Sequence, residues 1–144
     1  MALYTYKSGL VFATFGPIML NSGRGDGDFL VIEQNEDSFS LLMGADGDGT
    51  RSQSNNRSGK FTVTLINSDP NNDLLSAMHN VDINSNGDGI NPFSVMDMSG
   101  TSVFSCERAW IIKPPSTTFG RETGSREWVF ETDNLIQHHG GNVL

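Results

Sequence analysis

Residues 59–81 read GKFTVTLINSDPNNDLLSAMHNV, and this stretch predicts a strand, a tight turn and a helix in direct succession. Apolar and polar residues alternate over 61–65, the period of two that is typical of a strand with one buried face. Asp69 can cap a helix N-terminus, and Pro70 follows where its missing N–H costs nothing. The helix is expected over about residues 70–81. Its apolar side comprises Leu74, Leu75, Met78 and Val81.

The rest of the chain predicts strands and polar loops, so we expect a mainly β fold in which the helix packs on a sheet. The strand candidates are residues 10–15, 18–20, 29–32, 39–43, 93–98, 101–113 and 126–136. In the longest of them, one face carries Phe104, Cys106, Trp110 and Ile112, interrupted by Arg108. In the last, Trp128 and Phe130 share one face, while the other face reads Glu127, Val129, Glu131 and Asp133.

The composition indicates one small acidic domain over residues 1–144. The hydrophobic share is 36%, which favours short strands joined by many turns over long helices. Seventeen acidic residues against nine basic ones give a formal charge of −8. Such a surface repels nucleic acid, because binding to a duplex depends on Lys and Arg neutralising phosphates.

Two polar segments stand apart from the predicted sheet. Residues 44–59, GADGDGTRSQSNNRSG, contain no Leu, Ile, Val or aromatic residue and are expected to form a long hairpin arm between two strands. Residues 137–144, with His138-His139 and two glycines, are expected to form a mobile tail. Neither the arm nor residues 84–89 matches a calcium loop, because the positions that need Gly or Glu hold other residues.

Features of an enzyme or a membrane protein are missing from the sequence. Cys106 is the only cysteine, which excludes an intrachain disulfide and is expected to be an inert buried thiol. The three histidines lack the spacing of metal ligands, and no nucleophile elbow, phosphate-binding loop or dinucleotide fingerprint occurs. We therefore expect no catalysis, no cofactor and no metal. No stretch is long and apolar enough to span a bilayer, and a cytoplasmic location is expected.

The sequence resembles a family of tail tube proteins of contractile-tailed, myovirus-type bacteriophages. The resemblance is clearest from about residue 44 to residue 135. It is carried by GADG at 44–47, SGKFTVTL at 58–65, SDPN at 68–71 and LLSAM at 74–78. It continues through CERAWIIK at 106–113, PP at 114–115, GRE at 120–122 and EWVFE at 127–131.

The resemblance implies a small β-barrel or sandwich flanked by one helix. It also implies hexameric rings that stack into a hollow tube inside a contractile sheath, through which phage DNA leaves without specific binding. The implied partners are further copies of the chain, the tail sheath protein, and the baseplate and tail-terminator proteins. The implied location is the virion, after assembly in the cytoplasm of the host bacterium. Rings formed head-to-tail would also pair the edge strands that a small sheet leaves exposed.

Two sets of residues follow as hypotheses. Glu127, Glu131 and Asp133 are expected to line the lumen, where negative charge discourages phosphates from binding to the wall. The alternative is an outer solvated face for these carboxylates. Asp46, Asp48, Arg51 and Arg57 of the arm are expected to make the contacts between stacked rings.

Three other functions stay open on the sequence alone. One is a soluble β-sandwich binding module that uses its Asn- and Asp-rich loops for calcium or sugar. The second is a head-completion or tail-terminator protein, and the third is the tube protein of a contractile injection particle.

Overall fold

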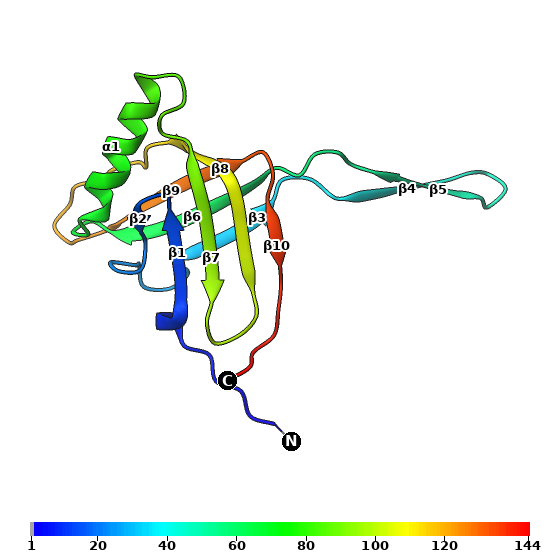
Figure 1. Cartoon of the computed structure of the whole chain (residues 1–144), viewed down its shortest axis with the longest axis horizontal. Helices are drawn as coiled ribbons and strands as arrows, with labels where there is room; N and C mark the ends of the chain where they lie inside the picture. The colour runs from blue at the N-terminus through cyan, green and yellow to red at the C-terminus, as the bar shows by residue number, and fades with distance from the viewer. Residues whose placement is uncertain (1) are drawn as a thin grey trace.

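The computed structural model describes residues 2–144 and contains one large curved sheet, one α-helix and a projecting hairpin (Figure 1). The large sheet has the strand order β2-β1-β7-β8-β9-β6-β3, with β10 paired to β8 off this path. Strands β4 and β5 form a separate sheet. The elements are η1 Ser8–Leu10, β1 Val11–Phe15, β2 Ile18–Met19, β3 Leu30–Gln34, β4 Phe39–Met43, β5 Gly49–Gln53, β6 Gly59–Ile66, α1 Asn71–Ile83, β7 Asn91–Asp97, β8 Val103–Lys113, β9 Ser125–Thr132 and β10 Ile136–His138. The mainly β fold with one helix is confirmed.

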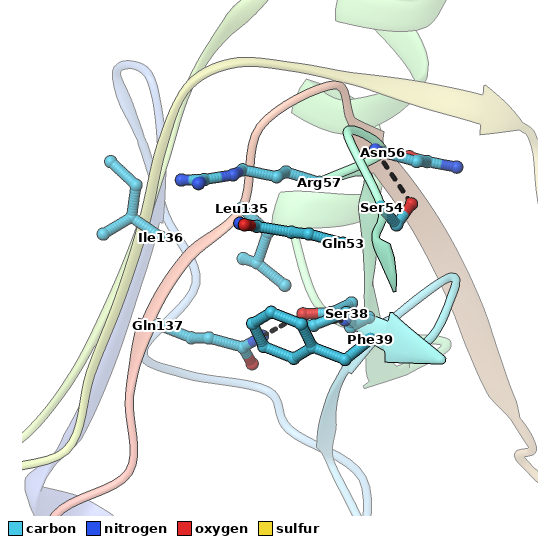
Figure 2. Close-up of a pocket in the computed structure, with 10 residues that line it drawn as sticks. Ser38, Phe39, Gln53, Ser54, Asn56, Arg57, Leu135, Ile136 and Gln137 are labelled. Atoms are coloured by element: carbon cyan, nitrogen blue, oxygen red, sulfur yellow. Dashed lines mark hydrogen bonds between the residues drawn. The ribbon is translucent and has the colours of Figure 1, made fainter. Parts of the chain in front are cut away.

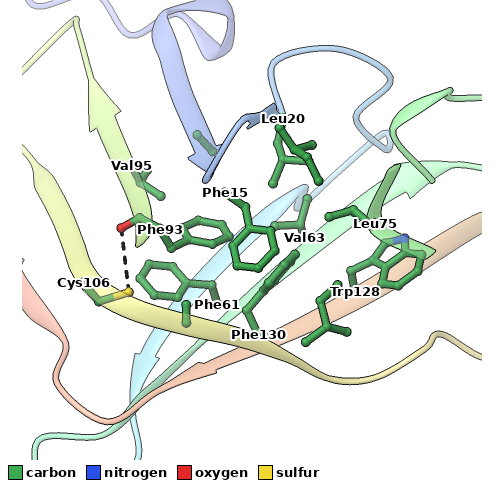
Figure 3. Packing of buried hydrophobic residues seen from close by; sticks show 14 of the residues in the cluster. Phe15, Leu20, Phe61, Val63, Leu75, Phe93, Val95, Cys106, Trp128 and Phe130 are labelled. Atoms are coloured by element: carbon green, nitrogen blue, oxygen red, sulfur yellow. Dashed lines mark hydrogen bonds between the residues drawn. The ribbon is translucent and has the colours of Figure 1, made fainter. Parts of the chain in front are cut away.

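The large sheet curls around a core of aromatic side chains (Figure 3). Phe61 on β6 and Phe93 on β7 are separated by β8 and β9 in the strand order, yet their rings stack with centroids 4.2 Å apart. Phe130 on β9 packs edge-on against Phe93 at 4.9 Å, and Phe15 on β1 lies 4.8 Å from Phe130. All four rings are fully buried. Strands this far apart share one core because the sheet closes towards a barrel, as predicted.

Arg24, in the loop before β3, joins the two sides of the curled sheet. Its backbone forms an isolated bridge with Leu65 on β6. Its guanidinium donates to the carbonyl oxygens of Ser8 and Val11, at the start of β1. The ring of Phe29 lies 4.7 Å from the guanidinium carbon. Burial lowers the pKa of Arg24, but an arginine remains charged in proteins, so these are charge-assisted hydrogen bonds.

The helix begins after Pro70 and ends at Ile83, two residues later than predicted. Only part of its predicted apolar side faces the sheet: Leu75 is fully buried, but Leu74 and Val81 are about half exposed. The predicted apolar side is therefore not the buried face as a whole, since the buried residues of the helix are Asn72 and Leu75, with Met78 packed against the core. The Asn72 side chain bonds both to the turn before the helix and to β9.

A bulge in β8 overturns the predicted face of that strand. Cys106 pairs with Phe93 of β7, but the next pair joins Ala109 to Asn91, so three steps along β8 oppose two along β7. The extra residue shifts the alternation by one. As a result Ala109 and Ile111 are buried, while Trp110 and Ile112, expected on the same face as Cys106, lie on the outer side.

The C-terminal residues 137–144, expected to form a mobile tail, lie against the body of the protein. Strand β10 pairs with the first residues of β8. The Gly140 N–H donates to the Ser102 hydroxyl at 3.0 Å, and the Thr5 N–H donates to the carbonyl oxygen of Leu144 at 2.8 Å. The two ends of the chain therefore lie close together (Figure 1). Any motion of the tail must break these hydrogen bonds.

Candidate assembly surfaces

The hairpin of β4 and β5, residues 39–53, projects from the body (Figure 1). From here on, the arm means this hairpin, and its root is the pair of segments, 35–38 and 54–58, that join it to β3 and β6. All ten residues of the arm's two strands are exposed. The arm begins before the predicted residue 44, because β4, which we expected to flank the excursion, is itself half of the hairpin. Each strand spans roughly 17 Å at about 3.4 Å per residue. A two-stranded hairpin is marginally stable alone in water, so this arm is an element that needs a partner.

The arm has one apolar side. Phe39, Leu41 and Met43 alternate along β4 and share this side with Arg51 of β5. The guanidinium carbon of Arg51 lies 3.9 Å from the centre of the Phe39 ring, a cation–π contact. Gly49, opposite Met43, leaves room for the sulfur and for Leu41, since a Cβ there would lie 3.0 Å from that sulfur. Exposed apolar side chains in this density mark a contact surface.

The four arm residues singled out from the sequence lie at three separate places. Asp46 and Asp48 are in the turn at the tip, which a backbone hydrogen bond of 2.7 Å closes. Arg51 is in the middle of β5. Arg57 lies at the root, where its carbonyl oxygen accepts a 2.8 Å hydrogen bond from the Leu135 N–H. The arm is thus acidic at its tip and carries Arg51 along its length, while Arg57 lies at a root that also holds Glu36 and Asp37.

A groove of about 360 Å³ lies where the arm leaves the body (Figure 2). The side chains of Gln53 and Arg57 extend across it in the same direction. Its other wall comes from the segment around β10, with Leu135, Ile136 and Gln137. The Gln137 side-chain amide donates to Gln34 on β3 at 2.9 Å and joins the two walls. The root of the arm is therefore fixed, although the arm beyond it is exposed.

The three carboxylates expected to line the lumen lie on the outer side of the sheet. Along β9 and the residue after it, Glu127, Glu131 and Asp133 alternate with side chains that face the core. Trp128 and Phe130, predicted to face the core, are 1% and 0% exposed. The predicted alternation is therefore confirmed, and the three carboxylates share one face.

This outer face is less acidic than β9 alone suggests. Lys60 of β6 is the cross-strand neighbour of Glu131. Arg108 of β8 forms an ion pair with Asp133, the single ion pair among residues 2–144. Glu127 pairs across the strands with Thr64 and has no cation opposite it. Lys113 of β8, the cross-strand neighbour of Val129, lines the same hollow as Glu127, so each of the three carboxylates has a cation nearby.

Cys106 and His139, two residues with catalytic potential, each pack against other parts of the fold. Cys106 is 4% exposed, its thiol lies 3.8 Å from the carbonyl oxygen of Phe93, and burial raises its pKa. A neutral buried thiol is a poor nucleophile. His139 packs edge-on against Phe104. Across the described residues, no group of three or more His, Cys, Asp or Glu side chains is placed to hold a metal ion.

The described part of the chain has no helix that is long and apolar enough to cross a membrane.

Comparison with known proteins finds a phage protein family and a phage protein that are similar to this chain in sequence. The family described as Bacteriophage PhiTE tail tube protein matches residues 4–140. Structural protein ORF10 of Pseudomonas phage KPP10 is 30% identical over 122 residues, which cover 84% of this chain and 70% of that protein.

Solved structures show the same fold at low sequence identity. The sheath–tube complex of an extracellular contractile injection system, PVC, in its extended state aligns with a TM-score of 0.61 at 11% identity, over 94% of this chain and 92% of that chain. The tube-terminating cap of the anti-feeding prophage aligns with a TM-score of 0.58 at 10% identity, over 96% and 93%. The PVC sheath/tube terminator aligns with a TM-score of 0.53 at 13% identity, over 96% and 100%.

Proposed function

We propose that this chain, which belongs to the family of the bacteriophage PhiTE tail tube protein, is the repeating subunit of a tail tube built from stacked hexameric rings. Family membership makes it a structural protein of the phage tail and a component of the virion. In the proposed assembly the rings enclose a channel through which phage DNA is ejected. Such a role depends on contacts between copies of the chain and requires no catalytic centre.

The observation that carries this proposal is the exposed arm. Its ten strand residues have no cover, and its apolar side presents Phe39, Leu41 and Met43 to solvent. An element of this kind is stable only when another surface covers it. A copy of the same chain supplies that surface in a head-to-tail contact, which repeats from subunit to subunit.

The arm residues are assigned to contacts between rings. In this proposal Asp46 and Asp48 at the tip, and Arg51 and Arg57 along the arm and at its root, pair with charges on the neighbouring ring. The support is that Arg51 and Arg57 form no ion pair among the described residues, although the chain has nearly twice as many acidic as basic side chains. Unlike charges on different copies steer and orient association.

The outer face of β9 is assigned to the lumen. Glu127, Glu131 and Asp133 share this face, and Glu127 has no cation opposite it. A wall of negative charge repels DNA phosphates, so a passing genome does not adhere to the channel. The neighbouring cations Lys60, Arg108 and Lys113 weaken this field within one chain.

The remaining partners follow from the proposed position in the tail. A contractile sheath surrounds the tube, a baseplate starts it and a terminator ends it, and assembly takes place in the cytoplasm of the host bacterium. The support is the fold, which recurs in a sheath–tube complex and in tube-terminating proteins.

Negative-stain electron microscopy of the purified protein at low and high concentration tests the proposal. We expect rings at low concentration and hollow tubes of stacked rings at high concentration, without any added ligand. A ligand-binding module would instead remain dispersed and would gain thermal stability on addition of calcium or a sugar. That second outcome would overturn the proposed function.

A further inference from the structure

The core of the protein is left uncovered at one end. A groove of about 490 Å³ opens there, between the start of β1, the facing ends of β7 and β8, and β3. This end lies beside the two chain termini and opposite α1 (Figure 1). Five partly buried apolar residues pack against the core, and four of them line this groove: Val11, Leu30, Ile32 and Phe104. The groove therefore has an apolar floor that continues the hydrophobic core.

The rim of this groove carries two carboxylates, from Asp28 and Asp97. The Arg24 guanidinium lies behind the lining, where it bonds to the carbonyl oxygens of Ser8 and Val11. One carboxylate oxygen of Asp97 already accepts hydrogen bonds from the backbone N–H and the hydroxyl of Ser99. Asp28 is exposed and lies two residues before β3 begins at Leu30. An apolar floor with a negative rim fits a ligand that is apolar with one positive charge.

One side of the arm has this chemistry, while the carboxylates of Asp46 and Asp48 lie apart from it at the tip. Its apolar side presents Leu41 and Met43, and Arg51 is the cation among them. The arm of one copy projects away from its own body, so it does not reach the groove of the same chain (Figure 1). The two unpartnered surfaces are complementary but can meet only between different copies.

We propose that the groove receives the arm of a second copy of this chain, with Leu41 and Met43 on the apolar floor and Arg51 paired with Asp28. This inference rests on the proposed function and adds the receiving site to it. Because each copy offers one arm and one groove, the contact is heterologous and leaves a free arm and a free groove after every addition. The same pair of surfaces can therefore extend a stack to any length.

Disulfide cross-linking between copies tests this pairing. The test variant carries Leu41→Cys and Asp28→Cys, and the control carries Leu41→Cys and Glu122→Cys, which lies in the exposed loop before β9. Cys106 is buried and is present in every variant, so any cross-linking through it is the same in the test and the control. After assembly and oxidation, we expect the test variant to give a ladder of two, three and more linked chains on a non-reducing gel. The control and the unmodified chain are expected to remain mainly single chains.

The outcomes separate this inference from the proposed function. Tubes visible by electron microscopy without a ladder, or with an equal ladder in the control, would overturn the groove as the receiving site and leave the tube intact. Failure of the unmodified chain to form rings or tubes would overturn the proposed function and the inference with it. A second test exchanges the charges: Arg51→Asp and Asp28→Arg should each reduce assembly, and the combined variant should restore it.

Discussion

The indole nitrogen of Trp128 donates a 2.9 Å hydrogen bond to the side-chain oxygen of Asn72, although 56 positions separate the two residues. Both side chains are buried. The amide nitrogen of Asn72 donates in turn to the carbonyl oxygens of Ile66, at 2.9 Å, and Asp69, at 3.1 Å. One asparagine thus joins α1, the turn that precedes it and β9. This contact, together with the buried Leu75, holds the helix on the sheet.

Replacing Asn72 with alanine should lower the free energy of unfolding. The Asn72→Ala variant leaves the buried Trp128 N–H without a partner, and a buried unpartnered group costs about 1–3 kcal/mol, while the Ile66 and Asp69 carbonyl oxygens keep their backbone donors. Urea denaturation measures the loss. The matched control is Asn80→Ala on the exposed side of the same helix, which is expected to stay within about 0.5 kcal/mol of the unmodified chain. Equal stability of the two variants would contradict the role assigned to Asn72.

Local patterns predicted the strand over β6, the helix that follows it and the inward face of β9. The alternation over 61–65 is a property of a few consecutive residues, and so is the start of the helix, which Asp69 and Pro70 precede. The three carboxylates of β9 were placed on one face for the same reason. These predictions hold because no insertion interrupts the alternation in either strand.

The features that sequence did not predict depend on distant partners. The extra residue in β8 becomes visible only from its pairing with β7, so the predicted face beyond Cys106 was wrong. Arg24 looked like part of a polar loop, since nothing nearby indicates that its guanidinium reaches β1. The groove at the open end of the core was also missed, because it is formed by strands from both halves of the chain.

Substitution of Arg24 tests the closure of the sheet. The Arg24→Lys variant keeps the charge but loses the planar group that reaches two carbonyl oxygens, Ser8 and Val11. We expect the free energy of unfolding to fall by about 1–3 kcal/mol, the usual worth of hydrogen bonds to a charged group. Chemical denaturation provides the measurement. Arg121→Lys, in an exposed loop, is the control and should leave the unfolding midpoint unchanged.

The thiol of Cys106 should make stability decrease at alkaline pH. Burial raises its pKa, so the folded chain holds this proton more tightly than the unfolded chain does. Stability from this group is therefore complete below the ordinary thiol pKa and is lost as pH rises through the folded value. Between about pH 8 and pH 10, the unmodified chain should lose more stability than Cys106→Ala, measured by urea denaturation at each pH. Parallel pH profiles would contradict this prediction.

Charge reversal at Glu127 tests the assignment of the lumen. Glu127→Lys places one cation in every subunit at a position whose cross-strand neighbour is the uncharged Thr64. We expect assembled tubes of this variant to retain DNA at low salt and to release it as salt increases, measured by co-sedimentation. The control Glu122→Lys adds the same charge in the exposed loop before β9. Equal DNA retention by both variants would place Glu127 outside the channel.

Deletion of Thr50–Asn56 tests most directly the claim that the arm connects stacked rings. The measurement is the distribution of tube lengths by negative-stain electron microscopy, for the deletion variant beside the unmodified chain at equal concentration. The account predicts long tubes from the unmodified chain and single rings or very short stacks from the variant, while circular dichroism shows that the remaining sheet is folded. An unchanged distribution of tube lengths in the deletion variant would contradict it.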